Sequence, residues 1–362
     1  MRSSRHFVAH YSSNVIAALA FGATIGSAGA QAPYTVVMSG LENPRGLAFA
    51  PNGALYVTEA GRGGPPGPHN CGANGAGEFR CYGLTGAVTR LWKGEQSRVV
   101  EGMPSHALTD GSTAGGPNGI SFHGTAYIAL GLGGGPELLE AFGSDFLGTL
   151  IHMPASGKWK VVADVAIYEF EENPAGGPLD SNPFGVLAEP GGRLVVDAGA
   201  NALLNVAANG SIETLAVFPS IPNPTPVGPP QIDAVPTSVA RGPDGALYVG
   251  QLTGAPFVPG LANIYRVVPG HPPVVHCSGF KTIISLAFGA DGSLYVVEHA
   301  TGGLFFPPNS GQVTRVAPNC ARTTVLGGLD RPTSIAIGTD GAIYVTNHGI
   351  TPGIGEVLKI GP

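Results

Sequence analysis

The stretch GPDGALYVGQ, Gly242–Gln251, places a turn dipeptide before a short strand of apolar residues. Three near-copies occur in the chain: APNGALYVTE at Ala50–Glu59, GADGSLYVVE at Gly289–Glu298 and GTDGAIYVTN at Gly338–Asn347. Asn-Gly and Asp-Gly favour the two-residue type I′ turn that joins two antiparallel strands. Each copy is therefore predicted to be a β-hairpin, and the repetition indicates a repeat protein.

Six units emerge when the chain is aligned on the turn glycine. These glycines are Gly53, Gly124, Gly192, Gly245, Gly292 and Gly341. An apolar strand precedes each turn, a second strand follows it, and a third comes next, as in GAVTRLW and GQVTRVA. The first five units also have a fourth strand, whereas the sixth reaches Pro362 after its third. Each unit is predicted to form one four-stranded antiparallel sheet.

The strand missing from the sixth unit is found at the other end of the chain. YTVVMSG, Tyr34–Gly40, matches TTVLGGL, which is the fourth strand of the fifth unit. An N-terminal strand that completes the last sheet closes a ring and removes two exposed sheet edges. Such a permutation is hard to explain in an open solenoid. The predicted fold is all-β: a six-bladed β-propeller closed by its N-terminal strand.

A family resemblance rests on these repeats. NPRGLAFAPNGALYVTEAG, Asn43–Gly61, followed by GAVTRLW, resembles NHL-type repeats. The whole arrangement resembles the ScyD/ScyE family, secreted propellers named for the scytonemin biosynthesis cluster, over residues 35–362. The similarity is strongest at Asn-Pro-Arg-Gly, at EAGRGG and in the GxVxR third strands. The resemblance implies involvement with a secondary metabolite, but no settled reaction defines the family.

Residues 1–30 have the features of a secretory signal peptide. Two arginines precede a short apolar run rich in small residues, and the run ends in Ala28-Gly29-Ala30. A basic segment, a short apolar segment and an A-x-A site are typical of signal-peptide cleavage. We predict a signal peptide at 1–30, removed near Ala30, and a propeller domain at 31–362 that is secreted or periplasmic.

The composition fits a turn-rich β-protein and excludes some partners. The chain contains 57 Gly and 33 Pro, which indicates disorder only when hydrophobicity is low, and here 43% of residues are apolar. Only 12% are charged, and a net charge of −6 provides no basic surface for nucleic acid. No later run is long enough to span a bilayer. We expect a monomer that binds no nucleic acid.

Four cysteines are candidates for disulfides in an exported protein. Cys71 and Cys81 lie ten residues apart in one glycine-rich loop, and we predict that they pair. Cys277 and Cys320 would pair by elimination. However, the predicted register places them on opposite faces, about 15 Å apart, which is beyond the reach of a disulfide. The sequence therefore does not decide whether Cys277 and Cys320 pair.

The two faces of the predicted propeller differ in the length of their connections. Turns of about two residues join the inner strands on one face. The other face carries five long segments: 61–85, 104–116, 131–147, 166–182 and 219–235. Long loops in a compact domain are usually functional or disordered. We call this second surface the long-loop face and expect the functional site there.

Some motifs on the long-loop face have ordinary explanations. GLGGGPE, Gly131–Glu137, is glycine-rich, but it connects two strands, and we predict a loop rather than the start of a helix. EFEEN, Glu169–Asn173, is either a weak cation site or a solvated turn. Phe257, Phe305 and Phe306 lie in connections on the same face, where we expect them to pack between neighbouring loops.

Polar residues are expected around the mouth of the channel, where the second strand of each blade ends and the first begins. The predicted ligand-binding residues are Arg45, Glu59, Asn118, Asn182, Asp197, Gln251, Glu298, His299, Arg331, Asn347 and His348. Convergent polar groups can bind a polar ligand or a metal. Propeller axes also contain polar residues and water without any function, because six strands cannot fill the channel.

A metal-dependent lactonase is one chemistry for this ring. Glu59, Asn118, Asn182 and Asp197 carry the oxygens that a calcium ion prefers, and calcium is the only cofactor that these residues suggest. GGPNGISF also resembles the start of a strand in gluconolactonases. The equivalent positions of other blades hold Arg45, Thr237 and Thr333, so the ligand set of those enzymes does not carry over.

Two other functions stay open. A quinoprotein dehydrogenase would use Arg45, Arg331, His299 and His348 around an anionic quinone, and a lyase would need only one histidine. A binding scaffold for a small molecule or a protein needs no catalytic group. No P-loop, nucleophile elbow or HExxH motif is present, so no catalytic residue is assigned. We therefore predict a binding scaffold that uses the long-loop face.

Overall fold

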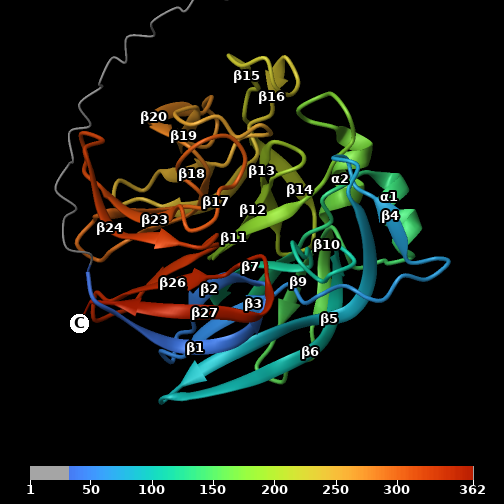
Figure 1. Ribbon diagram of the computed structural model, residues 1–362, viewed down its shortest axis with the longest axis horizontal. Coiled ribbons are helices and arrows are strands. Elements are labelled where there is room, and N and C mark those ends of the chain that lie inside the picture. The colour runs from blue at the N-terminus through green and yellow to red at the C-terminus, as the bar shows by residue number, and fades with distance from the viewer. Residues whose placement is uncertain (1–31, 362) are drawn as a thin grey trace, which may run out of the picture. The chain divides into compact units, whose positions relative to one another are not determined.

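A computed structural model describes residues 32–361 and shows the predicted six-bladed β-propeller. Each blade is an antiparallel sheet whose first strand is innermost (Figure 1). The predicted signal peptide lies outside the described residues. No helix in the described part of the chain has the length and apolar character needed to cross a membrane.

The blades follow one another in chain order. Blade 1 contains β2 (Pro44–Phe49), β3 (Leu55–Glu59), β5 (Phe79–Trp92) and β6 (Glu95–Ala107). Blade 2 contains β7 (Pro117–His123), β8 (Thr125–Leu130), β9 (Thr149–Met153) and β10 (Lys160–Asp164). Blade 3 contains β11 (Pro183–Glu189), β12 (Gly192–Asp197), β13 (Ala202–Ala207) and β14 (Ile212–Val217).

The second half of the ring repeats this order. Blade 4 contains β17 (Pro236–Arg241), β18 (Leu247–Gln251), β19 (Ala262–Val267) and β20 (Val274–Phe280). Blade 5 contains β21 (Ile283–Phe288), β22 (Leu294–Glu298), β23 (Gly311–Val316) and β24 (Arg322–Leu329). Blade 6 contains β25 (Ile335–Ile337), β26 (Ile343–Asn347), β27 (Pro352–Ile360) and β1 (Tyr34–Glu42).

Strand β1 closes the ring as predicted. It pairs antiparallel with β27, from Tyr34 opposite Ile360 to Glu42 opposite Pro352 (Figure 1). Met38 and Leu41 are only 2% and 1% exposed. The N-terminal strand therefore supplies both the outer edge of blade 6 and part of its core.

The core lies between successive blades. Leu194 and Val196 of blade 3, for example, pack with Val239 and Val249 of blade 4 in one buried cluster. A single sheet has two apolar faces and cannot cover either one alone, so each blade depends on its neighbours. This dependence explains why the chain repeats its hairpin sequence.

The predicted type I′ turns are wrong. Gly53 has a left-handed φ of 84°, but the preceding Asn52 does not, and the Gly53 N–H donates to Ala50 O. This is the type I turn followed by a left-handed residue that three-residue hairpins use. The Asn52 side chain accepts the N–H of Ala54 at 3.1 Å, which explains why Asn or Asp precedes the glycine.

The long segments contain more regular structure than predicted. Residues 131–135 of GLGGGPE form a loop, as predicted, but that loop leads into helix α1 (Pro136–Phe142), with Pro136 in its first turn, so the motif does open a helix. Helix α2 (Val165–Glu172) includes most of EFEEN, which is therefore not a solvated turn. Short strands are also present: β4 (Cys71–Ala73), β15 (Ile221–Pro222) and β16 (Gln231–Ile232).

Both pairs of cysteines form disulfides. Cys71 and Cys81 are bonded within the first long segment, as predicted. Cys277 and Cys320 are also bonded, with 5.6 Å between their Cα atoms. The predicted separation was too large because Cys277 does not end its strand: β20 continues to Phe280. Two disulfides are typical of proteins from oxidising compartments.

Candidate functional site

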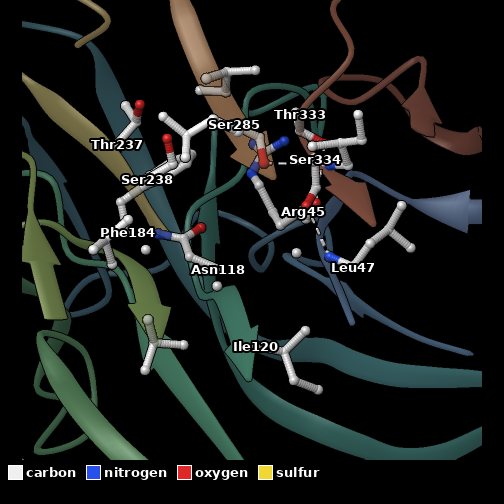
Figure 2. Close-up of a pocket in the computed structure, with 18 residues that line it drawn as sticks. Arg45, Leu47, Asn118, Ile120, Phe184, Thr237, Ser238, Ser285, Thr333 and Ser334 are labelled. Carbon is white, nitrogen blue, oxygen red and sulfur yellow. Dashed lines mark hydrogen bonds between the residues drawn. The ribbon is translucent and has the colours of Figure 1, made fainter. Parts of the chain in front are cut away.

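The first strands of the six blades line the central channel in three layers. The layer nearest the long-loop face contains Arg45, Asn118, Phe184, Thr237, Ile284 and Thr333. The middle layer contains Gly46, Gly119, Gly185, Ser238, Ser285 and Ser334. The third contains Leu47, Ile120, Val186, Val239, Leu286 and Ile335. Figure 2 shows these side chains around a common space, a cavity of about 120 Å³.

The three layers differ in chemistry. All six residues of the third layer are buried aliphatic residues, so that end of the cavity is apolar. Glycine is required in the middle layer of blade 1, because a Cβ on Gly46 would lie 2.6 Å from Asn118 O of the next blade. The middle layer adds the hydroxyls of Ser238, Ser285 and Ser334, so the polar side chains at the axis belong to the first two layers.

Most polar groups of the first layer hold neighbouring blades together. Thr237 Oγ1 donates to Ile283 O at 2.8 Å, and Thr333 Oγ1 donates to Pro44 O at 2.7 Å. Asn118 Nδ2 donates to Pro183 O at 3.1 Å. Each bond joins the inner strand of one blade to that of another. These hydroxyl and amide donors are therefore engaged in structural contacts.

Arg45 is the charged group of the first layer. It is 7% exposed, and among residues 32–361 it forms no ion pair. Its guanidinium donates to the backbone carbonyls of Gly349 and Ala114, the latter at 2.5 Å. Burial, followed by repulsion from Arg80, lowers the pKa of Arg45 to about 10, so it remains protonated at neutral pH. A buried cation held by carbonyls alone attracts an anion.

His299 lies in the same sector of the mouth. It is 6% exposed, and its Nδ1 lies 2.9 Å from Pro332 O. A carbonyl can only accept, so Nδ1 carries the proton and Nε2 has a free lone pair. Burial lowers the pKa of His299 to about 4, and the positive charges of Arg45 and Arg331 contribute. His299 is therefore a neutral hydrogen-bond acceptor at pH 7.

Arg331 and His348 share one carboxylate beside His299. Arg331 Nη1 donates to Asp330 Oδ1 at 3.0 Å, and His348 Nδ1 lies 3.3 Å from Asp330 Oδ2. Arg331 and His348 both have left-handed φ values, 46° and 54°. Ordinary residues adopt this conformation at a cost, and it is concentrated at functional sites. We call Arg45, His299, Arg331 and His348 the basic group; His299 itself is neutral at pH 7, and Asp330 pairs with Arg331.

The predicted residues at the ends of the second strands are engaged by neighbouring backbone or side-chain groups. Glu59 accepts the N–H of Glu42 at 2.7 Å and pairs with Arg98 at 2.8 Å. The residues that likewise accept an N–H from the connection into the first strand are Asp197, Glu298 and Asn347. Gln251 differs, because its Oε1 accepts the N–H and the Nδ2 of Asn263. All five side chains are therefore held by hydrogen bonds from nearby strands or connections.

Asn182 is close to the first layer although it does not line the cavity. Its Oδ1 and the Nδ2 of Asn118 lie over Gly131, where a Cβ would be 2.6 Å and 2.2 Å from them. Gly131 therefore has to be a glycine so that the two amides can approach each other. Of the eleven predicted residues, Arg45 and Asn118 line the cavity. Four more lie beside residues that line it or that hold Arg45: Asn182, His299, Arg331 and His348.

The sequence did not indicate that Arg80 and His106 lie near Arg45. Arg80 donates to Thr113 O at 2.7 Å, next to Ala114, whose carbonyl holds Arg45. His106 is 3% exposed, and burial lowers its pKa to about 3, with contributions from Arg80 and Arg45. The position of Arg80 beside the Cys71–Cys81 disulfide was the only signal for it in the sequence. Arg80 pairs with Glu78 at 2.7 Å, and its repulsion contributes to the lowered pKa of Arg45.

An acidic residue on the long-loop face is buried without compensation. Glu169 of α2 is 2% exposed, and its Oε2 accepts no hydrogen bond from the described residues. Burial raises the pKa of Glu169 to about 7, and repulsion from Asp197 and Asp180 contributes. Burial likewise raises the pKa of Asp180 to about 6. Glu169 therefore changes its charge near neutral pH.

The Glu169→Gln variant is expected to be more stable than the parent at pH 8, by about 1 kcal/mol. The folded-state pKa of Glu169 is raised from 4.5 to about 7, so folding favours the protonated form and its contribution to stability falls as pH rises between those values. Melting temperatures at pH 5 and pH 8 test this. Glu171→Gln, which alters an exposed residue of the same helix, should leave the pH dependence unchanged.

Comparisons with known proteins show the fold but no family. No protein-family model and no curated protein matches the chain. Among solved structures, a protein assigned as a gluconolactonase has a TM-score of 0.54 at 13% identity, with 92% of each chain covered. One assigned as an oxidoreductase (glucose dehydrogenase) from Thermus thermophilus has a TM-score of 0.56 at 20% identity, covering 91% of this chain and 99% of that one.

A third similar structure is a luciferin-regenerating enzyme. Its TM-score is 0.52 at 10% identity, covering 91% of this chain and 96% of that one. The three neighbours are assigned different activities on one architecture. Similarity at this level of identity establishes the propeller fold and leaves the activity to be argued from the site.

Proposed function

We propose that this protein binds a small organic anion, such as a carboxylate, at the channel mouth on the long-loop face. Arg45 carries the proposal, because it is a buried cation without an ion-pair partner among the described residues. A carboxylate would form charge-assisted hydrogen bonds with it in a desolvated setting, where such bonds are strong. The charges of Arg331 and Arg80 still lower the pKa values of His299 and Arg45, respectively, although Asp330 and Glu78 pair with these two arginines.

The size of the space favours a small molecule over a protein partner. The cavity beside Arg45 measures about 120 Å³, and the aliphatic third layer forms part of its lining. A carboxylate group and a few further atoms fill such a volume, whereas a protein surface cannot enter it. The resemblance to the ScyD/ScyE family agrees with a metabolite as the ligand.

His299 would give the bound molecule an orientation. Its Nε2 lone pair can accept a hydrogen bond from a hydroxyl or an amide of the ligand, while the Nδ1 proton is held by Pro332 O. The Arg45 cation selects a ligand with a negative charge, and the neutral His299 selects a ligand that also carries a hydrogen-bond donor.

The alternative is a metal-dependent lactonase, and a neighbour assigned as a gluconolactonase has this fold. The residues fit a calcium ion poorly. The carboxylates of Glu59 and Asp197 already accept backbone hydrogen bonds. That leaves the amides of Asn118 and Asn182 beside the cation of Arg45, which repels a second cation. A quinone cofactor would meet a similar difficulty, because Arg331 is already paired with Asp330.

Arg45→Met is expected to abolish carboxylate binding, measured by isothermal titration calorimetry with benzoate and butyrate. Methionine retains much of the apolar volume and removes the charge. Arg315→Met is the matched control, since Arg315 is exposed and pairs with Asp291. Binding by the parent should also weaken as salt is raised. Equal affinities in the parent and a folded Arg45→Met variant would refute the proposal.

A further inference from the structure

An aromatic wall stands beside His299 at the channel mouth. Phe257, in the connection between β18 and β19, and Phe306, in the connection between β22 and β23, have ring centroids 4.1 Å apart. The ring of Phe306 stands nearly perpendicular to the imidazole of His299, with 5.0 Å between centroids. Phe306 is half-buried, so part of its ring remains accessible.

The backbone fixes this wall in place. The Phe305 N–H donates to Pro256 O at 2.9 Å, which ties the connections of blades 4 and 5 together. Arg331 Nη2 donates to Phe306 O at 3.1 Å, and the buried Lys281 donates to Phe305 O at 2.5 Å. Two cations of the mouth therefore position the aromatic residues through their carbonyls.

The conformation of these connections is costly for the residues that adopt it. Phe257 and Phe305 have left-handed φ values of 57° and 58°. For a bulky residue this conformation costs about 1–3 kcal/mol, and it persists where the surrounding structure imposes it, often at ligand clamps. Core packing does not require the left-handed conformation of Phe305, because this side chain is 52% exposed.

The aromatic wall and the basic group are joined by hydrogen bonds. The Arg331 side chain donates to the backbone carbonyl of Phe306. The carbonyl of Pro332, the next residue, accepts the hydrogen bond from His299 Nδ1. Thr333, the residue after that, bonds to Pro44, which precedes Arg45. A short stretch of blade 6 thus connects the aromatic wall, the neutral histidine and the buried guanidinium.

We infer that the ligand is a planar aromatic acid, whose ring lies against Phe306 and Phe257 and whose carboxylate is held by Arg45. The inference rests on the proposed function and names its ligand class. Offset or edge-to-face aromatic contacts add about 0.5–1.5 kcal/mol beyond the area they bury. A saturated ring of the same charge and similar size lacks this contribution, so it binds more weakly at the same site.

Benzoate and cyclohexanecarboxylate are the probes, titrated calorimetrically into the protein. The parent is expected to bind benzoate about fivefold more tightly. Phe306→Leu, which retains an apolar side chain and removes the ring, should reduce the ratio to near one. Phe257→Leu, on the neighbouring blade, should have the same effect and provides a second variant if the first does not fold. Phe305→Leu is the matched control and should leave the ratio unchanged.

The outcomes separate this inference from the proposed function. If both acids bind with equal affinity and binding depends on Arg45, the proposed function stands and the aromatic ligand class is refuted. If neither acid binds, the proposed function itself fails. A ratio that falls equally in the Phe305 and Phe306 variants would assign the preference to a general loosening of the connections and would also refute the inference.

Discussion

A chain shortened to residues 43–362 is expected to lose cooperative folding, because it lacks strand β1. The deletion removes the buried Met38 and Leu41 and exposes the outer edge of β27. Truncating one buried leucine to alanine typically costs about 2–5 kcal/mol, and loss of the strand also removes a full ladder of backbone hydrogen bonds. The net stability of a domain is only about 5–15 kcal/mol.

Circular dichroism melting and size-exclusion chromatography measure this effect. The exposed edge of β27 should also promote association between chains. A chain of residues 32–362 retains β1 and is the control. Leu41→Ala provides a graded version, with an expected loss of about 3 kcal/mol. A monomeric 43–362 chain with an unchanged melting temperature would contradict the proposed role of β1 in closing the ring.

Asp197→Ala is expected to destabilise the protein by about 3–5 kcal/mol, because it leaves several buried donors without an acceptor. Asp197 is fully buried and accepts hydrogen bonds from four donors: Ser181 Oγ at 2.7 Å, Asn182 N at 2.6 Å, Gly199 N at 3.0 Å and Ala200 N at 3.1 Å. Burial without a cation raises the pKa of Asp197, and these hydrogen bonds oppose that shift.

Urea denaturation of Asp197→Ala and Asp197→Asn provides the measurement. Asparagine retains one acceptor oxygen, so its variant should lose about 1–2 kcal/mol. Benzoate binding by the folded variants should remain close to that of the parent, since Asp197 faces its own blade. A stable Asp197→Ala protein that no longer binds ligand would instead place this carboxylate in the binding site.

The repeats were sufficient to predict blades, strand order and closure, because each depends on local pattern and chain order. The turn glycines, the apolar strands and the YTVVMSG segment together specify which strands pair. Turn type was predicted wrongly at Asn52-Gly53, since the dipeptide alone does not reveal the wider loop. The sequence did not decide whether Cys277 and Cys320 pair. Their pairing depends on where strand β20 ends and on how the turn that contains Cys320 lies against that strand.

The candidate site was predicted only in outline. The repeat alignment predicted that Glu59, Asp197 and Glu298 end the second strands of their blades, and each of them does. The direction of each side chain is set by the N–H groups of the adjacent connection, which a repeat alignment does not contain. Arg45 occupies a position of the same repeat, but its strand is the innermost and its side chain is held at the axis.

The order of residues along the chain specifies the propeller, its closing strand and the face with the long connections, because hydrophobic period and turn chemistry act over a few residues. Which polar groups are free depends instead on how the folded chain brings distant segments together. Gly349 and Ala114, for example, lie far apart in the sequence and both hold Arg45. A buried polar group must find its partners in space. The polar groups that remain available for a ligand are therefore known only once the fold has distributed those partners.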